Sequence, residues 1–424
     1  MTSLSPNLSA RVTIETASVA KRLESVAPAA VSRPSVLFDS LPEAEDAFFV
    51  ADLGEVYRQY LQWRQLLPRV EPFYAVKCNP DPSVIRLMVK LGIGFDCASR
   101  SELQTVLDLG APADSIVYAN PCKQPSHLRY ALEHQVRLMT FDNSDELRKV
   151  KKLYPNAHLL LRILTDDSKS LCQLGIKFGA PLNTTVGLLR LARELGLTVV
   201  GVSFHVGSGC RDASPFADAV LRAHRVFQEG TELGFDMDIL DIGGGFPSAL
   251  VREGVTFPQA AEALRGALDT YFPPSKGVRI IAEPGRYFVS SAFTLAVNIV
   301  GRRVVADPLD PTTPTHFMYY VNDGVYGSFN CLMFDHATVY PKILVRDGEL
   351  HQPASPALIW GQTCDSIDCI RPTARLPELD VGDWLQFHDM GAYTVCAASR
   401  FNGFRPSRVV YTDAYNTIPY EYLL

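Results

Sequence analysis

The sequence predicts an α/β protein built from a (β/α)8 barrel followed by a mostly antiparallel β domain. Between residues 46 and 290, short apolar runs alternate eight times with amphipathic stretches, as in a barrel of parallel strands and helices. After residue 290 helical periodicity is scarce, and β-rich runs are separated by Asp-Pro, Asp-Gly and Gly-Asp turns. We therefore expect a segment 1–45 that contributes to the β domain, a barrel over 46–286, and a β domain over 287–424.

The apolar runs are rich in β-branched or aromatic residues, as buried parallel strands are. They are FYAVK (73–77), GFDCAS (94–99), IVYANP (116–121), LMTFDN (138–143), HLLLRI (158–163), VVGVSFHVG (199–207), ILDIGGG (239–245) and RIIAEPGR (279–286). Intervening stretches such as VGLLRLARELG repeat apolar residues at three- and four-residue spacing, which predicts helices with one buried face. An open, doubly wound sheet shows the same alternation, so counting favours the barrel only modestly.

Composition restricts the class of partner. The chain has 424 residues, and 40 basic against 46 acidic side chains give a net charge of -6, which argues against nucleic acid or an anionic membrane surface. No apolar run is long enough to span a bilayer. Nine scattered cysteines, with no Cys-x-x-Cys or HExxH motif, predict free thiols, a cytoplasmic location and no metal site.

Polar or charged residues end almost every predicted strand. Barrel enzymes assemble their active sites at the carboxyl ends of the strands, so these residues should meet at one rim. They are Lys77, Asp96, Asn120, Asp142, Arg162, His205, the glycines 243–245, Glu283 and Arg286. We predict the catalytic site there.

Part of this rim is suited to a phosphate group. The glycines 243–245 present backbone N–H groups that no Cβ shields, although a triple glycine alone is a weak signal. Ser208-Gly209 and Gly285-Arg286 complete the predicted phosphate site, where Arg286 would supply charge-assisted hydrogen bonds.

The other rim residues are suited to a ring and a carbonyl group. A partly desolvated lysine such as Lys77 can have a lowered pKa and attack a carbonyl as a free amine. Glu283 can pair with a pyridine-type nitrogen, and the flat ring of His205 can stack on a second ring. Together with the phosphate site, these groups predict a pyridoxal 5'-phosphate (PLP) site.

Longer motifs resemble the eukaryotic ornithine decarboxylase group. This group belongs to the fold-III PLP enzymes, which have an alanine-racemase-like barrel and a β domain. The resemblance extends from about residue 35 to about residue 408. The motifs are PFYAVKCNP, GFDCASRSEL, FHVGSGC, DIGGGFP, AEPGRYFV, NDGVYGSFNCLMFDH, TCDSIDC and MGAYTVCAASRFNGF.

The resemblance implies a role for each matching residue of the cofactor site. Lys77 would carry PLP, Glu283 would pair with the ring nitrogen, and His205 would stack on the ring. The phosphate would be held by Ser208, Gly245, Gly285, Arg286 and Tyr393. Asp96, Glu102 and Arg162 would surround the ring and the lysine.

The resemblance also implies how an amino-acid substrate is bound and protonated. Cys364 would deliver a proton to the substrate carbon once CO2 has left. Asp335 and Asp365 would bind the distal amine of a small-molecule substrate, and Tyr326 and Phe401 would line the pocket. In this family Tyr326, Phe401 and the loop with Cys364 enter from the neighbouring subunit, which implies a homodimer with shared active sites.

Three departures from the family pattern affect the expected substrate. Gln362 replaces an expected proline, Phe334 an expected tyrosine, and His388-Asp389 an expected Glu-Asn pair. The leading expectation is decarboxylation of L-ornithine to putrescine and CO2, in polyamine biosynthesis. The alternatives are a paralogue acting on lysine or a modified diamino acid in specialised (alkaloid) metabolism, and a non-catalytic homologue like the antizyme inhibitors. Racemase chemistry on the same fold is disfavoured because Cys364 lies in a decarboxylase-like motif.

Overall fold

The computed structural model describes residues 45–210, 212–248, 254–310, 312, 314–344, 354–413, 416–419 and 422. These residues form two compact units, and each is described by itself below. The barrel unit comprises Leu53–Ala292, Gly391–Cys396 and the residues from Thr417 onward. The sheet unit comprises the residues up to Asp52, Phe293–Met390 and Ala397–Asn416.

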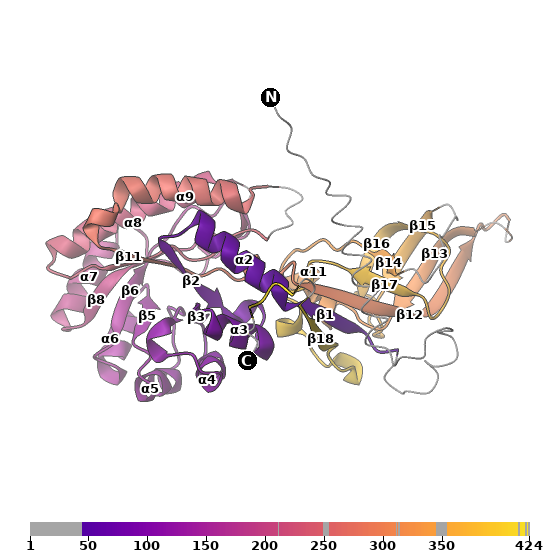
Figure 1. The fold of residues 1–424 in the computed structure, drawn as a ribbon, viewed down its shortest axis with the longest axis horizontal. Helices are drawn as coiled ribbons and strands as arrows, with labels where there is room; N and C mark the ends of the chain where they lie inside the picture. The colour runs from indigo at the N-terminus through magenta and orange to yellow at the C-terminus, as the bar shows by residue number, and fades with distance from the viewer. Residues whose placement is uncertain are drawn as a thin grey trace, which may run out of the picture. The chain divides into compact units, whose positions relative to one another are not determined.

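Eight parallel strands close the barrel in the order β10-β11-β2-β3-β4-β5-β6-β8 (Figure 1). They are β2 (Val70–Ala75), β3 (Gly94–Cys97), β4 (Ile116–Tyr118), β5 (Leu138–Phe141), β6 (His158–Arg162), β8 (Thr198–Ser203), β10 (Ile239–Asp241) and β11 (Arg279–Ala282). The closure confirms the predicted barrel and excludes the open, doubly wound sheet. All eight carboxyl ends therefore lie on one rim.

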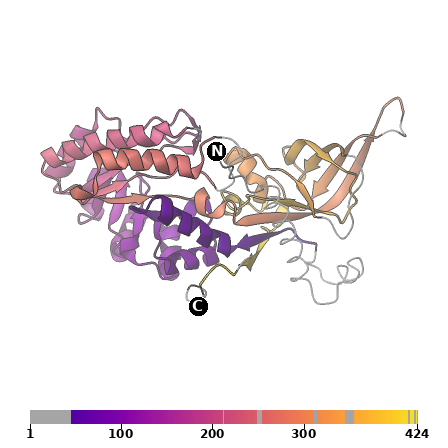
Figure 2. The same cartoon turned by 45° about the horizontal axis from the view of Figure 1, so that its top comes forward.

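Helices cover the outside of the barrel (Figures 1 and 2). They are α2 (Leu53–Leu66), α3 (Pro82–Lys90), α4 (Arg100–Asp108), α5 (Pro125–Glu133), α6 (Ser144–Leu153), α7 (Thr185–Glu194), α8 (Ser214–Glu232) and α9 (Phe257–Tyr271), with the short α10 (Arg286–Val289) after β11. Side-chain caps fix where several of them begin. Asp81 accepts the backbone N–H groups of Ser83 and Val84 at the start of α3, and Asn143 accepts that of Glu146 in α6.

Apolar side chains fill the barrel. This cluster consists of Phe73, Val117, Ala119, Leu138, Leu160, Val200 and Ile281, one or two residues from each of six strands or strand ends. Burying a side chain the size of Leu or Phe contributes about 1.5–3 kcal/mol, so the cluster stabilises the closed strand order. The polar residues lie beyond it, at the carboxyl ends of the strands.

The sheet unit contains a mostly antiparallel sheet, as the sequence predicts. Its main path is β14-β17-β12-β13-β15-β16, and β1 and β18 join it beside β12. The strands are β1 (Phe48–Asp52), β12 (Phe293–Ala306), β13 (Pro314–Val321), β14 (Lys342–Leu344), β15 (Ser355–Trp360), β16 (Cys369–Leu376), β17 (Trp384–Phe387) and β18 (Arg408–Thr412). Within this sheet, only the pairs β13–β15 and β1–β18 are parallel among the described residues.

The boundaries of the two units differ from those expected at 45/46 and 286/287. The chain enters the barrel unit after Asp52, because β1 pairs with β12 and β18 instead of with a barrel strand. It leaves the barrel after Ala292, because α10 packs on α2, where the Tyr287 hydroxyl donates to the carbonyl oxygen of Gln59 at 2.8 Å. Of the N-terminal segment 1–45, only Glu45 lies within the described residues.

Candidate active site

The PLP lysine expected from the sequence lies where the first barrel strand ends. Strand β2 runs into a single 3-10 turn, Val76–Cys78, which places Lys77 at the rim. The neighbouring strand β3 carries Asp96, which is paired in register with Ala75. Lys77 Nζ lies 2.6 Å from Asp96 Oδ2, and the Asp96 side chain has no exposed surface. The barrel therefore joins a half-exposed ammonium group to a buried carboxylate.

The environment of Lys77 corrects one expectation. Burial lowers the pKa of Lys77, but the charge and hydrogen bond of Asp96 outweigh it, so its pKa is raised and not lowered. The cause is the contact with Asp96, which favours the charged form. Lys77 is therefore an ammonium group here, and it must lose a proton before it can act as a nucleophile.

Glu283 follows β11 and belongs to a group of buried acids. Burial raises the pKa of Glu283, and the charges of Asp241 and Asp96 raise it further. Asp241, the last residue of β10, is hydrogen-bonded to Glu283. It also accepts the hydroxyl of Ser203 at 3.1 Å and the N–H of Gly243 at 2.9 Å. Asp241 was not among the predicted residues, because it lies inside an apolar run.

His205 follows β8 on the same rim. Its Nδ1 atom accepts the N–H of Gly207 at 3.0 Å, which assigns the lone pair to Nδ1. Burial, and then the charges of Arg162 and Lys77, lower its pKa well below the ordinary value. His205 is therefore a neutral ring at neutral pH. A neutral ring is compatible with the expected stacking on a flat partner.

The predicted phosphate residues form a cradle in which two glycines stand where a side chain would clash with the backbone. A Cβ on Gly243 would lie 1.9 Å from the carbonyl oxygen of Phe204, and one on Gly245 would lie 2.5 Å from that of Gly207. Both glycines have positive φ, +63° and +96°, which L side chains rarely adopt.

Arg286 completes the cradle. Its Nε and Nη2 atoms donate to Ser208 Oγ at 3.1 and 2.7 Å, and its guanidinium lies 5.1 Å from the ring centroid of Tyr393. Gly285 precedes it as the residue before α10, and a Cβ there would lie 2.9 Å from that of Cys78. The cradle thus combines a cation, hydroxyl groups and glycine backbone.

The remaining rim residues are placed around this centre. Glu102 Oε2 accepts the Ala98 N–H at 2.6 Å at the start of α4, and burial raises its pKa. The Arg162 guanidinium lies 5.3 Å from the ring of Phe178. Asn120 donates to the carbonyl oxygen of Ala98, and Asp142 accepts the N–H of Gly179. The last two hold loops together.

The residues predicted to bind substrate lie in the sheet unit, and three of them contact one another. The Tyr326 hydroxyl donates to Asp365 Oδ2 at 2.6 Å, and its ring stacks on Phe401 with centroids 4.3 Å apart. Cys364, next to Asp365, is exposed and donates its backbone N–H to Asn402 Oδ1 at 3.0 Å. A thiol, a carboxylate and an aromatic pair are therefore gathered on neighbouring loops.

Asp368 holds these loops together, and sequence reasoning missed it. Its buried carboxylate accepts the N–H groups of Val325 and Thr363 at 2.8 and 2.9 Å. A Cβ on either Gly324 or Gly361 would lie 2.2 Å from its Oδ1 atom. The glycines let the two loops close around one acid.

Asp335 and the departures from the family pattern also lie in this unit. Asp335 follows the short helix α11 (Cys331–Phe334) and donates its N–H to the Cys331 carbonyl oxygen. Phe334 precedes it with 72% of its surface exposed. Gln362 is half-buried in the Cys364 loop, and His388 Nδ1 lies 3.2 Å from Thr294 Oγ1.

The barrel residues fit a phosphorylated pyridine ring. The buried atoms Glu283 Oε1 and Asp96 Oδ1 have no hydrogen-bond partner among the described residues, which suits a ring nitrogen and the lysine-linked end of the ring. The cradle of Ser208, Gly245 and Arg286 suits the phosphate. Lys77 lies beside Asp96 at the same rim, where it could carry the ring.

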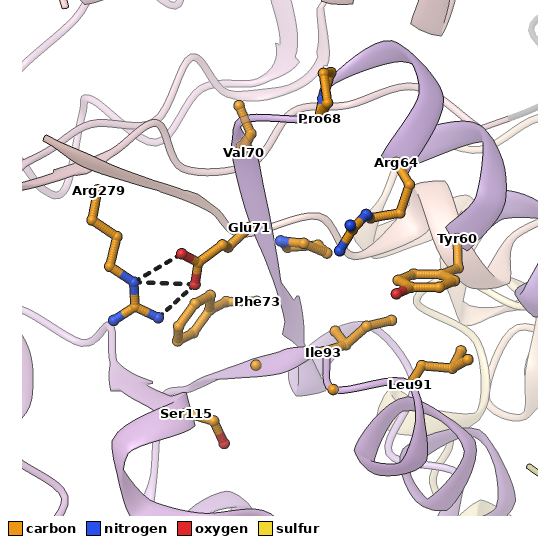
Figure 3. A pocket seen from close by; sticks show the side chains of 13 residues that line it. Tyr60, Arg64, Pro68, Val70, Glu71, Phe73, Leu91, Ile93, Ser115 and Arg279 are labelled. Atoms are coloured by element: carbon orange, nitrogen blue, oxygen red, sulfur yellow. Dashed lines mark hydrogen bonds and ion pairs between the residues drawn. The ribbon is translucent and has the colours of Figure 1, made fainter. Parts of the chain in front are cut away.

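A second hollow lies at the opposite end of the barrel strands (Figure 3). It has a volume of about 120 Å³ and is lined by Val70, Gly94 and Arg279, the first residues of three strands. Two of its charged groups, Arg279 and Glu71, form an ion pair with a shortest distance of 2.6 Å, and Arg64 also lines it. It lacks the acid, base and phosphate-binding groups of the rim.

Comparison with known proteins decides the family. Residues 53–290 match the family described as "Pyridoxal-dependent decarboxylase, pyridoxal binding domain". The chain belongs to this decarboxylase family. PLP is therefore its cofactor, and the barrel is its PLP-binding domain, as expected from the rim residues.

Relatives of this decarboxylase chain extend the match beyond the barrel. It is 55% identical over 379 residues to "Ornithine decarboxylase" of Schizosaccharomyces pombe, covering 88% of this chain and 84% of that one. It is 51% identical to "Antizyme inhibitor 2" of Xenopus laevis, covering 88% and 82%. The arginine decarboxylase structure of Paramecium bursaria Chlorella virus has a TM-score of 0.81 and 36% identity, covering 87% and 96%.

Within the described ranges, no helix is both long and apolar enough to cross a membrane. In the same residues, no group of three or more His, Cys, Asp or Glu side chains is arranged to hold a metal ion.

Proposed function

We propose that this decarboxylase converts L-ornithine to putrescine and CO2. The observation that carries the proposal is the exposed Cys364 next to Asp365, whose carboxylate is held by Tyr326. A thiol can deliver a proton to carbon, and a carboxylate beside it can bind a distal ammonium group. High identity to a relative named ornithine decarboxylase supports the same substrate. Production of putrescine would place the enzyme in polyamine biosynthesis.

The barrel residues would bind and orient the cofactor. Bound PLP supplies an electron sink for the charge left on the substrate carbon when CO2 departs. Lys77 would hold the cofactor, and Glu283 would face its ring nitrogen while the neutral His205 lies against the ring. The phosphate would contact Ser208, Gly245, Gly285, Arg286 and Tyr393. Asp96, Glu102 and Arg162 would maintain the charge balance around them.

The residues of the sheet unit would select the substrate and complete the reaction. Asp365 and Asp335 would bind the distal ammonium group of a diamino acid, because a desolvated charge needs an opposite charge nearby. Tyr326 and Phe401 would line the pocket with their stacked rings. Cys364 would then protonate the α-carbon.

We also propose that the protein is a homodimer in which Cys364, Tyr326 and Phe401 of one copy complete the cofactor site of the other. Apolar side chains exposed on the sheet unit support this arrangement. They include Met333, Phe334, Ile367 and Phe401, with exposed fractions of 52%, 72%, 51% and 41%. Exposed apolar side chains favour association with a partner.

A cytoplasmic location is part of the proposal. All nine cysteines are free thiols, and four of them are buried, where they act as small apolar residues. Free thiols persist in a reducing compartment. Interaction with nucleic acid or membranes is not part of this function.

Two alternatives to ornithine decarboxylation can be distinguished by experiment. Gln362 and Phe334 flank the predicted substrate residues, so a paralogue acting on lysine or a modified diamino acid is the second candidate. The relative named antizyme inhibitor makes a non-catalytic homologue the third. The presence of Lys77, Glu283 and Cys364 favours catalysis, since a non-catalytic protein has no need of them.

A panel of amino acids, assayed for CO2 release with added PLP, tests the proposal. We expect the highest kcat/KM for ornithine, with lysine and arginine at least tenfold lower. Lys77→Ala should abolish release, while Lys169→Ala on an exposed loop should retain it. A preference for lysine would select the second candidate, and no release from any substrate, with PLP bound, would select the third.

A further inference from the structure

Asp241 is a buried carboxyl group that the proposed function does not use. It ends β10, and its side chain is completely buried. Asp241 is paired in register with Ile281 of the neighbouring strand β11, two residues before Glu283, so both side chains lie on the same face. The two carboxyl groups are in hydrogen-bond contact. Two neutral donors hold it in place, the Gly243 N–H at Oδ1 and the Ser203 hydroxyl at Oδ2. Asp241 is therefore fixed against Glu283.

Two carboxyl groups in hydrogen-bond contact need a proton between them. Ionised carboxylates only accept hydrogen bonds, so two anions cannot bond to each other, and burial makes their repulsion more costly. No donor among the described residues reaches the buried Glu283 Oε1 atom. The pair therefore carries one proton and one negative charge. Burial raises the pKa of both acids, which favours retaining that proton at neutral pH.

The surrounding groups determine which acid holds the proton. The two donors to Asp241 stabilise its charged form, so the proton lies on Glu283 and the charge on Asp241. The other charged or titratable groups of the rim come from four neighbouring elements. They are Asp96 on β3, Lys77 after β2, Arg162 on β6 and His205 after β8. Asp96 disfavours a negative charge on both Asp241 and Glu283, whereas Lys77 favours a negative charge on Glu283. His205 is neutral and favours neither.

We propose that Asp241 is a positioning residue that takes up the Glu283 proton when the cofactor binds. The proton moves from a Glu283 oxygen to an Asp241 oxygen along their hydrogen bond. Glu283 is then a carboxylate that accepts the N–H of the protonated ring nitrogen, and Asp241 is a neutral acid that donates to Glu283. Neither the number of protons nor the charge of the pair changes. The inference rests on the proposed role of Glu283 toward the ring nitrogen.

The pair solves a problem that one acid could not. Toward a ring that is already protonated, a single buried glutamate would be an unpaired charge before the cofactor binds, or else would have to release a proton to solvent as it binds. With Asp241 beside it, Glu283 changes its protonation state inside the protein. The pair remains a single negative charge that balances the protonated ring.

Infrared spectroscopy of the full-length protein tests this proposal, with PLP removed and then restored. The carbonyl stretch of a protonated carboxyl group is separate from that of carboxylates and amides. Wild-type protein should show this signal for the pair at neutral pH, and adding PLP should shift it without removing it. Glu102 and Asp323, whose pKa values burial also raises, contribute to every spectrum and cancel in the difference between wild type and variant.

Variants assign the signal to the pair. Asp241→Asn should lose it with or without PLP, because the amide donates to Glu283 and replaces the proton. Glu283→Gln should lose it for the same reason, whereas Asp212→Asn, at an exposed carboxylate of lowered pKa, should keep it. Retention of the full signal in Asp241→Asn would show that burial alone protonates Glu283, and the proposal would fail.

Two further outcomes decide the proposal even if Asp241→Asn does not fold. Disappearance of the wild-type signal on addition of PLP would show that the proton leaves the pair. Ser203→Ala removes one donor from Asp241, so the proton should move toward Asp241 and shift the signal; an unchanged signal would contradict the shared proton. None of these readouts depends on CO2 release, so failure of the proposed function in the substrate assay is a separate result.

Discussion

The hydroxyl of Tyr326 donates a 2.6 Å hydrogen bond to the carboxylate of Asp365, 39 positions later in the chain. This bond holds the pKa of Asp365 below its ordinary value, so the group is a carboxylate at neutral pH. The Tyr326 ring stacks on Phe401. The backbone carbonyl oxygen of Tyr326 accepts two hydrogen bonds from Ser399, one from its N–H and one from its hydroxyl. A charge suited to a distal ammonium group is thus positioned by an aromatic side chain.

Removing that charge should damage recognition of a diamino acid. We expect Asp365→Ala to lower kcat/KM for ornithine at least tenfold, or about 1.4 kcal/mol, because the distal ammonium loses its partner. Tyr326→Phe keeps the charge and loses only its orientation, so its effect should be smaller and mainly on KM. Steady-state kinetics of both variants provide the measurement. Equal kinetics for Asp365→Ala and wild type would locate substrate specificity elsewhere.

Asp368 should matter more for stability than an exposed acid of the same unit. Asp368→Asn places an amide donor against the N–H groups of Val325 and Thr363, and a buried donor left unpaired costs about 1–3 kcal/mol. The matched control is Asp380→Asn, which removes a surface ion pair with Arg302 worth about 0–1 kcal/mol. Denaturant unfolding gives both values. A loss no larger for Asp368→Asn than for the control would contradict this role.

The pattern of the sequence could predict the barrel, its catalytic rim and the PLP site. Strands alternating with helices, each ending in a polar residue, bring Lys77 and Glu283 to the same rim whatever the details of packing. The strand β1 was missed because an apolar run such as FFVAD is compatible with a barrel strand or with a sheet strand. Only its pairing with β12 shows that it belongs to the sheet unit.

Contacts between distant segments could not be predicted. The raised pKa of Lys77 depends on a contact with Asp96 across two strands, so the opposite direction was expected. Asp368 and Asn402 were missed because their bonds join loops 43 and 38 positions apart. Asp241 was missed because a buried acid in an apolar run gives no periodic signal.

Stability of the protein without PLP should fall as pH rises. Folding raises the pKa of Glu283 and Asp241, so the folded protein binds more protons than the unfolded chain above the ordinary carboxyl range. The free energy of unfolding should therefore be highest at mildly acidic pH and decrease through neutrality, and Glu283→Gln should flatten this slope. Denaturant unfolding at several pH values provides the test. A slope that is identical in the variant would assign it to other groups.

An exposed ion pair gives the opposite pH dependence. Lys169 contacts Asp212 between the loops before β7 (Ser170–Cys172) and after β9 (Ser208–Cys210), and this contact lowers the pKa of Asp212 to about 2. Its contribution is present at neutral pH and is lost as pH falls toward that value. Asp212→Asn should leave the decrease through neutrality unchanged, which makes it the control for Glu283→Gln.

PLP should be attached to Lys77. Borohydride reduction of the loaded protein should fix the cofactor to the peptide that contains Lys77, because the nearby Asp96 holds the side chain at the rim. Mass spectrometry of a digest identifies the labelled peptide, and Lys77→Ala should carry no label while Lys169→Ala carries it unchanged. Label on another lysine of the wild-type protein would reject the assignment.

The two sets of active-site residues should be supplied by different copies of the chain. Lys77 lies in the barrel unit and Cys364 in the sheet unit, and a two-fold dimer forms two equivalent sites together. Lys77→Ala and Cys364→Ala homodimers should each be nearly inactive. In a mixed dimer one site carries both changes and the other carries neither. Random exchange makes about half the dimers mixed, so activity should return to about a quarter of wild type. A mixture as inactive as its parents, with exchange confirmed by mass, would show that each site is built within one chain.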